Sequence, residues 1–275
     1  MVAACLQASA QITVTATAGT LGPTAYTQLR LAFNAINAGT HRGAITITVN
    51  AGTTETAPAI LNQNALPANY TSVLIKPAAA TTPTITGNLA GGSIVYLYGA
   101  TNVTIDGSNT VGGTSRDLTI TNTTATAGST VIRFGSPSTL VGASNNVVKN
   151  CVVRMSGPTI GIAITSGSGV TLFGVGEAPN SNNTIENNAV SNTQTGIYAY
   201  GPTGVWDANW TIQKNDVTGT GFGGIQINNG NGTRILDNNV SNVSINGGSP
   251  TGGIILSFEA RNTTIARNKI SGVNN

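Results

Sequence analysis

Five charged side chains are the weak candidates for catalysis in this sequence. They are Lys214, Asp237, Glu259, Arg261 and Arg267. A polysaccharide lyase needs a base, often Arg or Lys, and commonly acidic ligands for Ca²⁺. A glycoside hydrolase needs two carboxyl groups that face each other across the scissile bond. Glu259 and Arg261 supply one acid and one base, so neither set is complete.

Lys214, Asp237 and Arg267 occupy equivalent positions of a sequence repeat, together with Asn187. If the repeats stack as neighbouring strands, these side chains point outward and lie ~4.8 Å apart in a column of alternating charge. We expect a solvated stripe of ion pairs, each worth under about 1 kcal/mol. The alternative is a lyase-like cluster of Lys, Asp and Arg.

A group of residues near position 200 could bind sugars. Its members are Tyr198, Tyr200, Trp206, Asp207 and Asn209. Strand alternation points the two tyrosines outward, and the loop that follows can fold Trp206 alongside them. Aromatic rings stack on sugar rings, while Asp207 or Asn209 supplies hydrogen bonds. The alternative is that the tryptophans cover the loop and that Trp210 belongs to the core.

The sequence lacks the residues needed for metal, cofactor, nucleic-acid or membrane binding. His41 is the single histidine and is expected in a loop beside Arg42, so we predict no metal site and no cofactor. The 12 Lys and Arg residues are scattered, and the net charge is +3. Nucleic-acid binding needs a clustered basic patch with stacking aromatics, so we exclude nucleic acid as a partner. No stretch is long and apolar enough for membrane insertion.

The elements that position these residues follow from a repeat. Its four copies are Thr184–Ser191, Thr211–Thr218, Arg234–Ser241 and Thr264–Ser271, with anchors Ile185, Ile212, Ile235 and Ile265. The anchors are 27, 23 and 30 residues apart. In each copy, Asn follows the anchor by three positions and Val or Ile follows it by five. A period of about 20 to 50 residues is typical of a solenoid.

A second signature recurs once in each repeat. Its copies are Gly161–Ile164, Gly196–Ala199, Gly224–Ile227 and Gly253–Leu256. Both signatures place apolar residues at i and i+2, the period of a strand with one buried face. Gly and Asn supply the sharp corners. Three short strands per coil predict an all-β fold, a right-handed single-stranded parallel β-helix.

The second signature also predicts which side chains face outward. One expected column is Ala163, Tyr198, Gln226 and Ile255, with Arg133 one coil earlier, and the next is Thr165, Tyr200, Asn228 and Ser257. These columns contain no carboxylate. They therefore argue against a catalytic site on this surface.

The recurring Asn residues are predicted to be structural. Stacking places Asn188, Asn215, Asn238 and Asn268 in one internal column, where their amides hydrogen-bond along the stack as asparagine ladders do. In the preceding coil Cys151 takes the ladder position. We therefore expect Cys151 to be a buried packing residue without a disulfide.

The two ends of the chain lead to three predictions. Residues 26–39 are predicted as a helix that covers the first coil, with Leu29, Ala32, Phe33 and Ile36 on its buried face. Residues 1–10 resemble the tail of a secretory signal peptide, which leaves 11–275 as the β-helix domain. The sequence stops in mid-coil without a second cap, so we expect a C-terminally truncated fragment.

Residues 26–37, 43–49, 72–77 and 102–107 resemble the N-terminal region of large bacterial surface and secreted proteins that carry parallel β-helix repeats. Those proteins commonly leave the cell by type IX secretion. The C-terminal half resembles the β-helix repeat of the pectate-lyase-like superfamily. The resemblance implies an extracellular or cell-surface location. Such a fold hosts many activities and supplies none by itself.

Three hypotheses for the function remain open. The first is a non-enzymatic extracellular module, a stalk or adhesin that is monomeric within a larger chain and weakly binds a polysaccharide or cell-surface glycan. The alternative is a polysaccharide lyase or glycoside hydrolase of pectate-lyase-like fold. The third is an ice-binding solenoid, suggested by Thr-rich strands such as Ile45–Thr48. We rank it last because outward Thr is not expected to repeat in one column.

Overall fold

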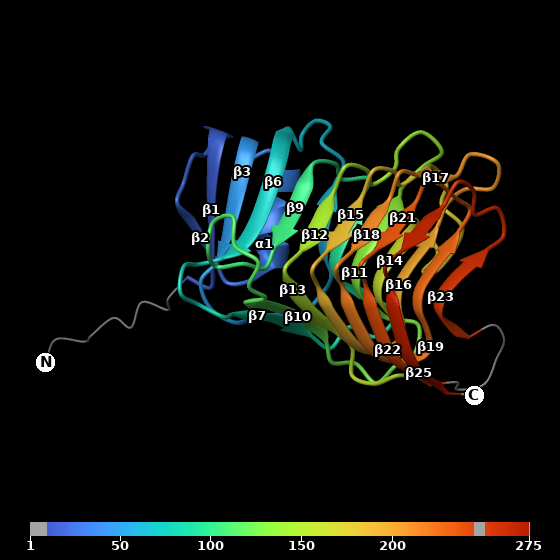
Figure 1. Cartoon of the computed structure of the whole chain (residues 1–275). Coiled ribbons are helices and arrows are strands. Elements are labelled where there is room, and N and C mark those ends of the chain that lie inside the picture. The colour runs from blue at the N-terminus through green and yellow to red at the C-terminus, as the bar shows by residue number, and fades with distance from the viewer. Residues whose placement is uncertain (1–9, 245–250, 275) are drawn as a thin grey trace, which may run out of the picture.

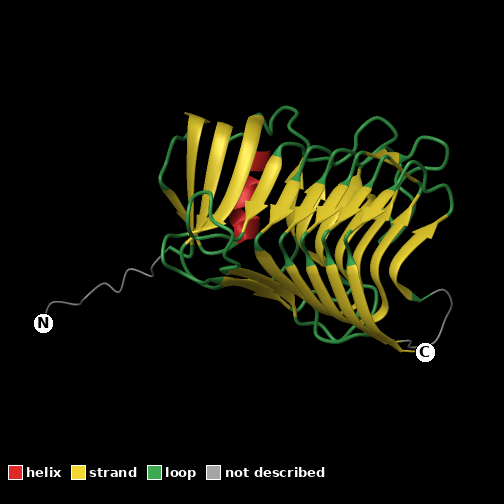
Figure 2. Ribbon diagram, in the orientation of Figure 1, coloured by secondary structure: helices red, strands yellow, loops and turns green. Residues whose placement is uncertain are grey.

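The computed structural model describes residues 10–244 and 251–274 and shows a parallel β-helix (Figures 1 and 2). Strands of successive coils pair in parallel along three faces, and the apolar core fills the space between them. The predicted all-β fold is confirmed. Residues 1–9 of the predicted leader lie outside the described residues. No helix in the described ranges is long and apolar enough to cross a membrane.

The first face is a 10-stranded sheet. In spatial order its strands are β2 (Thr24–Tyr26), β1 (Ile12–Gly19), β3 (His41–Val49), β6 (Tyr70–Pro77), β9 (Val103–Asp106), β12 (Val147–Lys149), β15 (Thr184–Glu186), β18 (Thr211–Gln213), β21 (Arg234–Leu236) and β24 (Thr264–Ala266). Only β1 and β2 are antiparallel to their neighbours, and they lie at the N-terminal edge.

The second and third faces belong to one 13-stranded sheet, because two long strands, β16 (Ala189–Tyr200) and β19 (Asp216–Asn228), run along both. The second face also contains β4 (Thr53–Glu55), β7 (Thr84–Gly87), β10 (Leu118–Asn122), β13 (Cys151–Arg154), β22 (Asn239–Ser244) and β25 (Lys269–Asn274). The third face also contains β5 (Ala59–Asn62), β8 (Ser93–Tyr98), β11 (Thr130–Ser136), β14 (Ile162–Ser168) and β23 (Gly252–Ser257). A short pair, β17 (Asp207–Ala208) and β20 (Gly230–Asn231), lies in the turns.

The anchor residues pair directly from coil to coil, as the repeat predicts. Val148 pairs with Ile185, Ile185 with Ile212, and Ile212 with Ile235. All four are fully buried. Stacked aliphatic side chains therefore form the core along the first face, and burial of each stabilises the fold by roughly 1.5 to 3 kcal/mol.

The predicted alignment of the second signature is wrong by two residues at its first copy. Ile164, not Ile162, pairs with Ile197. The outward column is therefore Arg133, Thr165, Tyr198, Gln226 and Ile255, so Thr165 takes the place expected for Ala163 and leaves the column expected for Tyr200. A shift of two residues preserves the side-chain alternation, so the sequence pattern could not exclude it.

The recurring glycine of this signature is explained by close packing between coils. A Cβ atom added to Gly224 would lie 2.3 Å from Cγ1 of Val240 in the next coil. Gly196 meets Val217 in the same way, at 2.5 Å. A larger side chain at either position would force the coils apart.

The column of Asn187, Lys214, Asp237 and Arg267 is not on a strand, contrary to the prediction. These residues have φ between 50° and 56° and each forms a one-residue corner between the first and second faces. A left-handed corner turns the chain sharply without a longer loop. The side chains still point outward from equivalent positions in successive coils.

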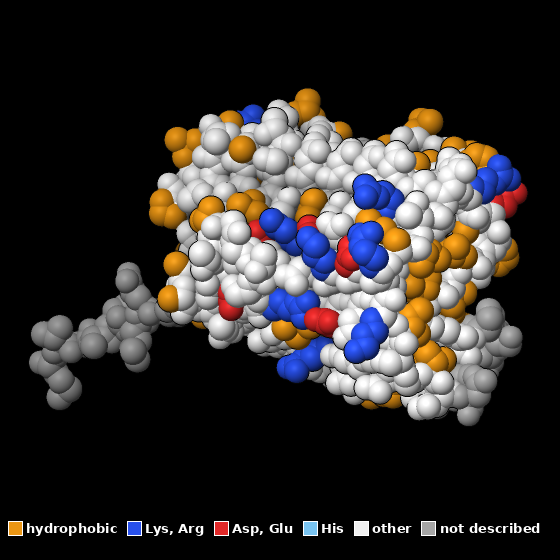
Figure 3. Space-filling model, in the orientation of Figure 1, with side chains coloured by type: hydrophobic (Ala, Val, Ile, Leu, Met, Phe, Trp, Pro, Cys, Tyr) orange, Lys and Arg blue, Asp and Glu red, His pale blue; other side chains and the backbone are white. Residues whose placement is uncertain are grey.

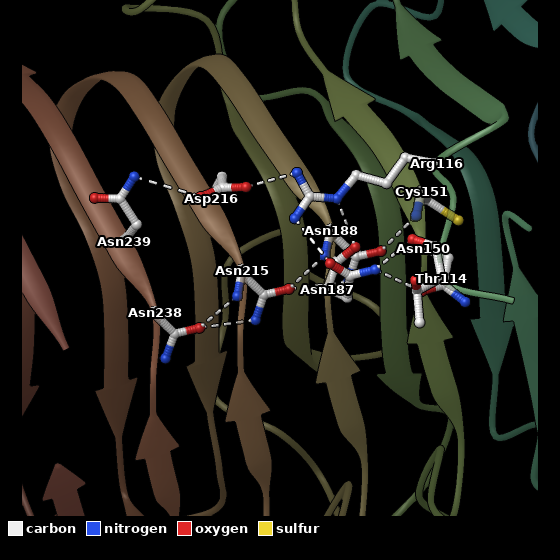
Figure 4. Close-up of polar contacts among 10 residues, drawn as sticks. All are labelled: Thr114, Arg116, Asn150, Cys151, Asn187, Asn188, Asn215, Asp216, Asn238 and Asn239. Carbon is white, nitrogen blue, oxygen red and sulfur yellow. Dashed lines mark hydrogen bonds and ion pairs between the residues drawn. The ribbon is translucent and has the colours of Figure 1, made fainter. Parts of the chain in front are cut away.

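The asparagine ladder follows these corners directly (Figure 4). In Asn188, Asn215 and Asn238 the backbone N–H and the Nδ2 group both donate to Oδ1 of the next ladder residue, at 2.9–3.1 Å. Asn268 accepts the last of these bonds. Cys151 occupies the preceding position, is buried, and donates its N–H to Oδ1 of Asn188 at 3.0 Å. The ladder thus satisfies polar groups that would otherwise be unpaired in the core.

A helix, α1 (Leu29–Asn37), covers the N-terminal opening of the core. It is shorter than the predicted range because Tyr26 belongs to β2. Leu29, Ala32, Phe33 and Ile36 are fully buried, as the pattern predicts. Residue Glu55 of β4 holds the start of the helix, since its carboxylate accepts the backbone N–H groups of Leu29 at 2.8 Å and Arg30 at 3.0 Å.

Replacing Glu55 by Ala is expected to lower the free energy of unfolding by about 2 kcal/mol, because two helix N–H groups lose a buried, charged acceptor. Chemical denaturation measures this loss. The matched control is Glu186→Ala, which breaks a partly exposed ion pair with Lys214 and should cost under about 1 kcal/mol. Equal losses in the two variants would contradict a capping role for Glu55.

The opposite end of the core is open within the described residues. Ile265, Ile270 and Val273 of the last coil are 40–47% exposed, whereas their partners Ile235 and Val240 are fully buried. Figure 3 shows apolar side chains gathered toward the C-terminal end.

Candidate functional site

The charged column at the corners consists of separate ion pairs. Arg267 donates two hydrogen bonds to Asp237, at 2.6 and 2.7 Å, and these bonds lower the pKa of that carboxyl. Lys214 pairs with Glu186 at 3.2 Å and not with Asp237. Positive and negative side chains therefore alternate over this part of the surface (Figure 3). The arrangement is that of the solvated stripe, although its pairing differs from the predicted one.

The longest-range contact of this corner was not predicted. Arg116, in the segment between β9 and β10, donates to the carbonyl and Oδ1 of Asn187, at 2.8 and 3.0 Å. It also forms an ion pair with Asp216 at 2.6 Å (Figure 4). A hollow of about 370 Å³ lies beside these residues, but its two lysines, Lys149 and Lys214, are each paired with a carboxylate. Arg116 therefore holds its loop against this corner, and both lysines of the hollow are paired with carboxylates.

Glu259 and Arg261 are partners of Trp206. The indole Nε1–H donates to Glu259 at 2.8 Å, and the guanidinium of Arg261 lies over the ring at 4.3 Å. Glu259 and Arg261 also pair with each other, at 3.4 Å. Trp206 therefore does not lie alongside the tyrosines as expected, and the ring that stacks on Tyr200 is Phe258, at 5.5 Å.

Asp207 cannot contact a ligand on the surface, contrary to the prediction. It is 1% exposed and accepts the backbone N–H of Asn180 at 2.7 Å. Burial raises its pKa to about 7. Asn209 is exposed but donates to Asn182 at 3.1 Å, within a row of turns. Trp210 is 1% exposed and packs against Phe134, so it belongs to the core.

Tyr198 lines a groove on the third face that we name the aromatic groove. Its lining residues are Ile162, Phe173, Gln194, Thr195, Tyr198, Phe222 and Gln226, around a volume of about 250 Å³. Phe173 comes from the loop after β14, and Phe222 lies at the corner where β19 passes from the second face to the third. None of the seven lining side chains is charged. Tyr200 lies beside Tyr198 with its ring edge-on, at 6.1 Å.

The polar groups of the aromatic groove are held by a buried residue. Asn228, which is 1% exposed, donates from Nδ2 to the hydroxyl of Tyr198 at 3.1 Å and accepts from Nε2 of Gln226 at 3.3 Å. Burial raises the pKa of Tyr198 to about 12, so its hydroxyl stays protonated at neutral pH. The groove therefore combines three aromatic rings with neutral hydrogen-bonding groups.

A second aromatic pair lies on the same face, nearer the N-terminus. Tyr96 and Tyr98 meet edge-on at 5.3 Å and line a groove of about 350 Å³ with Val170. The guanidinium of Arg133 lies over the ring of Tyr96 at 4.5 Å. The loop that contributes Val170 here also contributes Phe173 to the aromatic groove, so it borders both grooves.

Hydroxyl side chains recur on the second face, contrary to the expectation for outward Thr. Pairing aligns Thr86, Thr121, Arg154, Ser191, Thr218 and Ser241 in one column. Arg154 interrupts this column. The neighbouring outward column includes Val152 and Asp216 and so lacks regular hydroxyls.

His41 is also placed differently from the prediction. It is fully buried in β3, where Nδ1 lies 2.7 Å from the carbonyl of Thr20 and Nε2 lies 2.8 Å from the hydroxyl of Tyr26. Within the described residues, no group of His, Cys, Asp and Glu side chains is arranged to hold a metal ion.

A family model supports the fold that the strand pairing shows. The family model of the right-handed β-helix region matches residues 173–275. No curated protein sequence matches the chain. A bacteriophage CBA120 tailspike protein 2 enzymatically active domain is similar over 92% of this chain and 41% of that domain, with 11% identity and a TM-score of 0.41. The chain thus spans about two fifths of that structure.

Two further solved structures show weaker similarity. Endopolygalacturonase I from Stereum purpureum, complexed with galacturonate, has 13% identity over 84% of this chain and 95% of that enzyme, with a TM-score of 0.25. The catalytic domain of an alpha-1,3-glucanase in complex with nigerose has 13% identity over 91% of this chain and 68% of that domain, with a TM-score of 0.20. From the family match and the strand pairing, we conclude that the chain is a right-handed parallel β-helix, with residues 173–275 matching that family's region.

Proposed function

We propose that this β-helix is a non-enzymatic extracellular module of a larger surface or secreted protein and binds neutral glycans in the aromatic groove. The observation that carries the proposal is the lining of that groove. Phe173, Tyr198 and Phe222 offer ring faces and edges for stacking on a sugar, and Gln194 and Gln226 offer amides for its hydroxyl groups. The groove is open and small, so a single module binds weakly.

The absence of charge in the lining favours binding over catalysis. A lyase or hydrolase, the alternative function, needs a base or a pair of carboxyl groups at the sugar. Asp207 is buried, and Glu259 is occupied by Trp206 and Arg261. We therefore expect the protein neither to form unsaturated products from polyuronates nor to release reducing sugar from neutral glycans, with or without Ca²⁺. Turnover that disappears in Asp237→Ala or Glu259→Ala would contradict the proposal.

Replacing Tyr198 by Ala is expected to weaken glycan binding about tenfold, since the groove loses a ring and its hydroxyl together. A glycan array followed by calorimetric titration of the hits measures the change. The control is Lys214→Met, which alters the charged corner and should leave the affinity unchanged. Binding that depends steeply on salt and is lost in Lys214→Met would place the site at the corner instead.

An extracellular location, with or without export by type IX secretion, belongs to the same proposal. It is supported by a surface that is poor in charge and rich in Thr, Ser and Asn, with charged residues at 8% of the chain. Fractionation of the producing cells, with detection of the protein in the medium or on the cell surface, tests it.

A further inference from the structure

The hydroxyl of Tyr198 has a defined hydrogen-bond direction. It accepts a bond from Nδ2 of Asn228, and a phenol hydroxyl can both accept and donate. Among the described residues, the hydroxyl of Tyr198 makes no further hydrogen bond. Because Asn228 is buried and held in place, the hydroxyl is left as a donor toward the aromatic groove.

Gln226 supplies the complementary group. Its Nε2 donates to Oδ1 of Asn228 at 3.3 Å, which fixes the orientation of the amide. In the described structure, Oε1 of Gln226 receives no hydrogen bond from the protein. Gln226 and Tyr198 occupy neighbouring positions of one outward column, as β16 and β19 pair them directly. One donor and one acceptor therefore come from directly paired positions of adjacent strands along the groove.

Three of the five remaining lining residues are apolar, and the other two, Gln194 and Thr195, are polar but neutral. Phe173 and Phe222 bound the groove from two different elements, and Ile162 completes the apolar part. An uncharged lining gives no partner to a carboxylate or an ammonium group, and burying either without a partner is costly. The lining therefore favours a neutral substituent that is polar on one side and apolar on the other.

We propose that the aromatic groove selects a sugar that carries an acetamido group, an inference that rests on the proposed glycan binding. The acetamido carbonyl accepts from the hydroxyl of Tyr198, and its N–H donates to Oε1 of Gln226. Its methyl group packs against Phe173 and Phe222. A ring hydroxyl at the same position satisfies only part of this set, since it has no methyl group to pack against the two phenylalanine rings.

The test compares three trimers by calorimetric titration: the trimer of N-acetylglucosamine, the same trimer without acetyl groups, and cellotriose. The expected result is that the acetylated trimer binds about tenfold more tightly than either of the others. Tyr198→Phe, which keeps the ring and removes the donor, and Gln226→Leu, which removes the acceptor, should each reduce this preference to about twofold. Both side chains are partly exposed, so both variants are expected to fold.

The outcomes separate the inference from the proposed function. Equal binding of cellotriose and the acetylated trimer overturns the acetamido inference and leaves glycan binding in place. A preference that survives in both variants also overturns the acetamido inference, because other residues must then recognise the acetyl group. Failure of all three trimers and of a wider array of neutral glycans to bind overturns the proposed function itself.

Discussion

Replacing Asn215 by Leu is expected to lower the free energy of unfolding by about 3 kcal/mol or more. The side chain is 1% exposed, and its Oδ1 accepts from both the N–H and the Nδ2 group of Asn188. Its own Nδ2 donates to the carbonyl of Ile185 at 2.9 Å and to Asn238 at 3.0 Å. Leucine leaves these groups buried without partners, and each costs about 1 to 3 kcal/mol. The midpoint of urea unfolding measures the loss.

Asn239→Leu is the matched control, one residue beyond the ladder in the next coil (Figure 4). Its side chain is exposed and makes one long hydrogen bond, 3.4 Å, to Asp216. We expect a change within about 0.5 kcal/mol. Similar midpoints for the two leucine variants would show that the buried amide contributes no more than an exposed one. Glycan binding should be unchanged in both variants, since neither residue lines the aromatic groove.

The fold could be predicted because its determinants repeat. Ile185, Ile212 and Ile235 recur at nearly constant spacing, and one explanation, stacking in register, accounts for all of them. The same register places Asn215 and Asn238 in the ladder. Features that occur once were not predictable in this way. Glu55 meets the start of α1 across 26 residues, and no pattern in the sequence marks that contact.

Registers that differ by an even number of residues could not be told apart. A strand pattern repeats every two positions, so Ile162 and Ile164 are equally good partners for Ile197 by sequence. The one-residue corners were missed for a related reason. Lys214 and Arg267 adopt a left-handed conformation that is more usual for Gly, Asn and Asp, so their residue types did not indicate it.

The candidate site was predicted in part. Tyr198 was found from strand alternation alone. Phe173 and Phe222 were not, because they approach Tyr198 from a loop and a corner that are distant in the sequence. Trp206 and Asp207 were placed on the surface because they follow Tyr200 in a loop. In the structure the short strand β17 turns Asp207 into the core, and Trp206 packs under Arg261.

The buried Asp207 predicts an unusual dependence of stability on pH. Burial raises its pKa to about 7, although hydrogen bonds from Asn180 and Ser166 oppose the shift. In the unfolded chain the pKa of an aspartate is ~4. Between these values the unfolded chain is ionised while the folded chain holds the proton. The contribution of Asp207 to the free energy of unfolding is therefore largest below about pH 4. It decreases as the pH rises from about 4 to about 7, and it does not change further at higher pH.

Asp207→Asn is therefore expected to be more stable than the natural protein at pH 8, by as much as ~4 kcal/mol, and similar to it at pH 4. The asparagine Oδ1 can still accept the N–H of Asn180, and its Nδ2 can donate to Ser166, so the substitution removes the charge and keeps both contacts. Urea midpoints measured from pH 4 to pH 8 test this, and parallel curves for the two proteins would contradict it. Asp237→Asn is the control of opposite sign. The pKa of Asp237 is lowered by Arg267, so that variant should lose stability relative to the natural protein at pH 8 and regain parity at low pH.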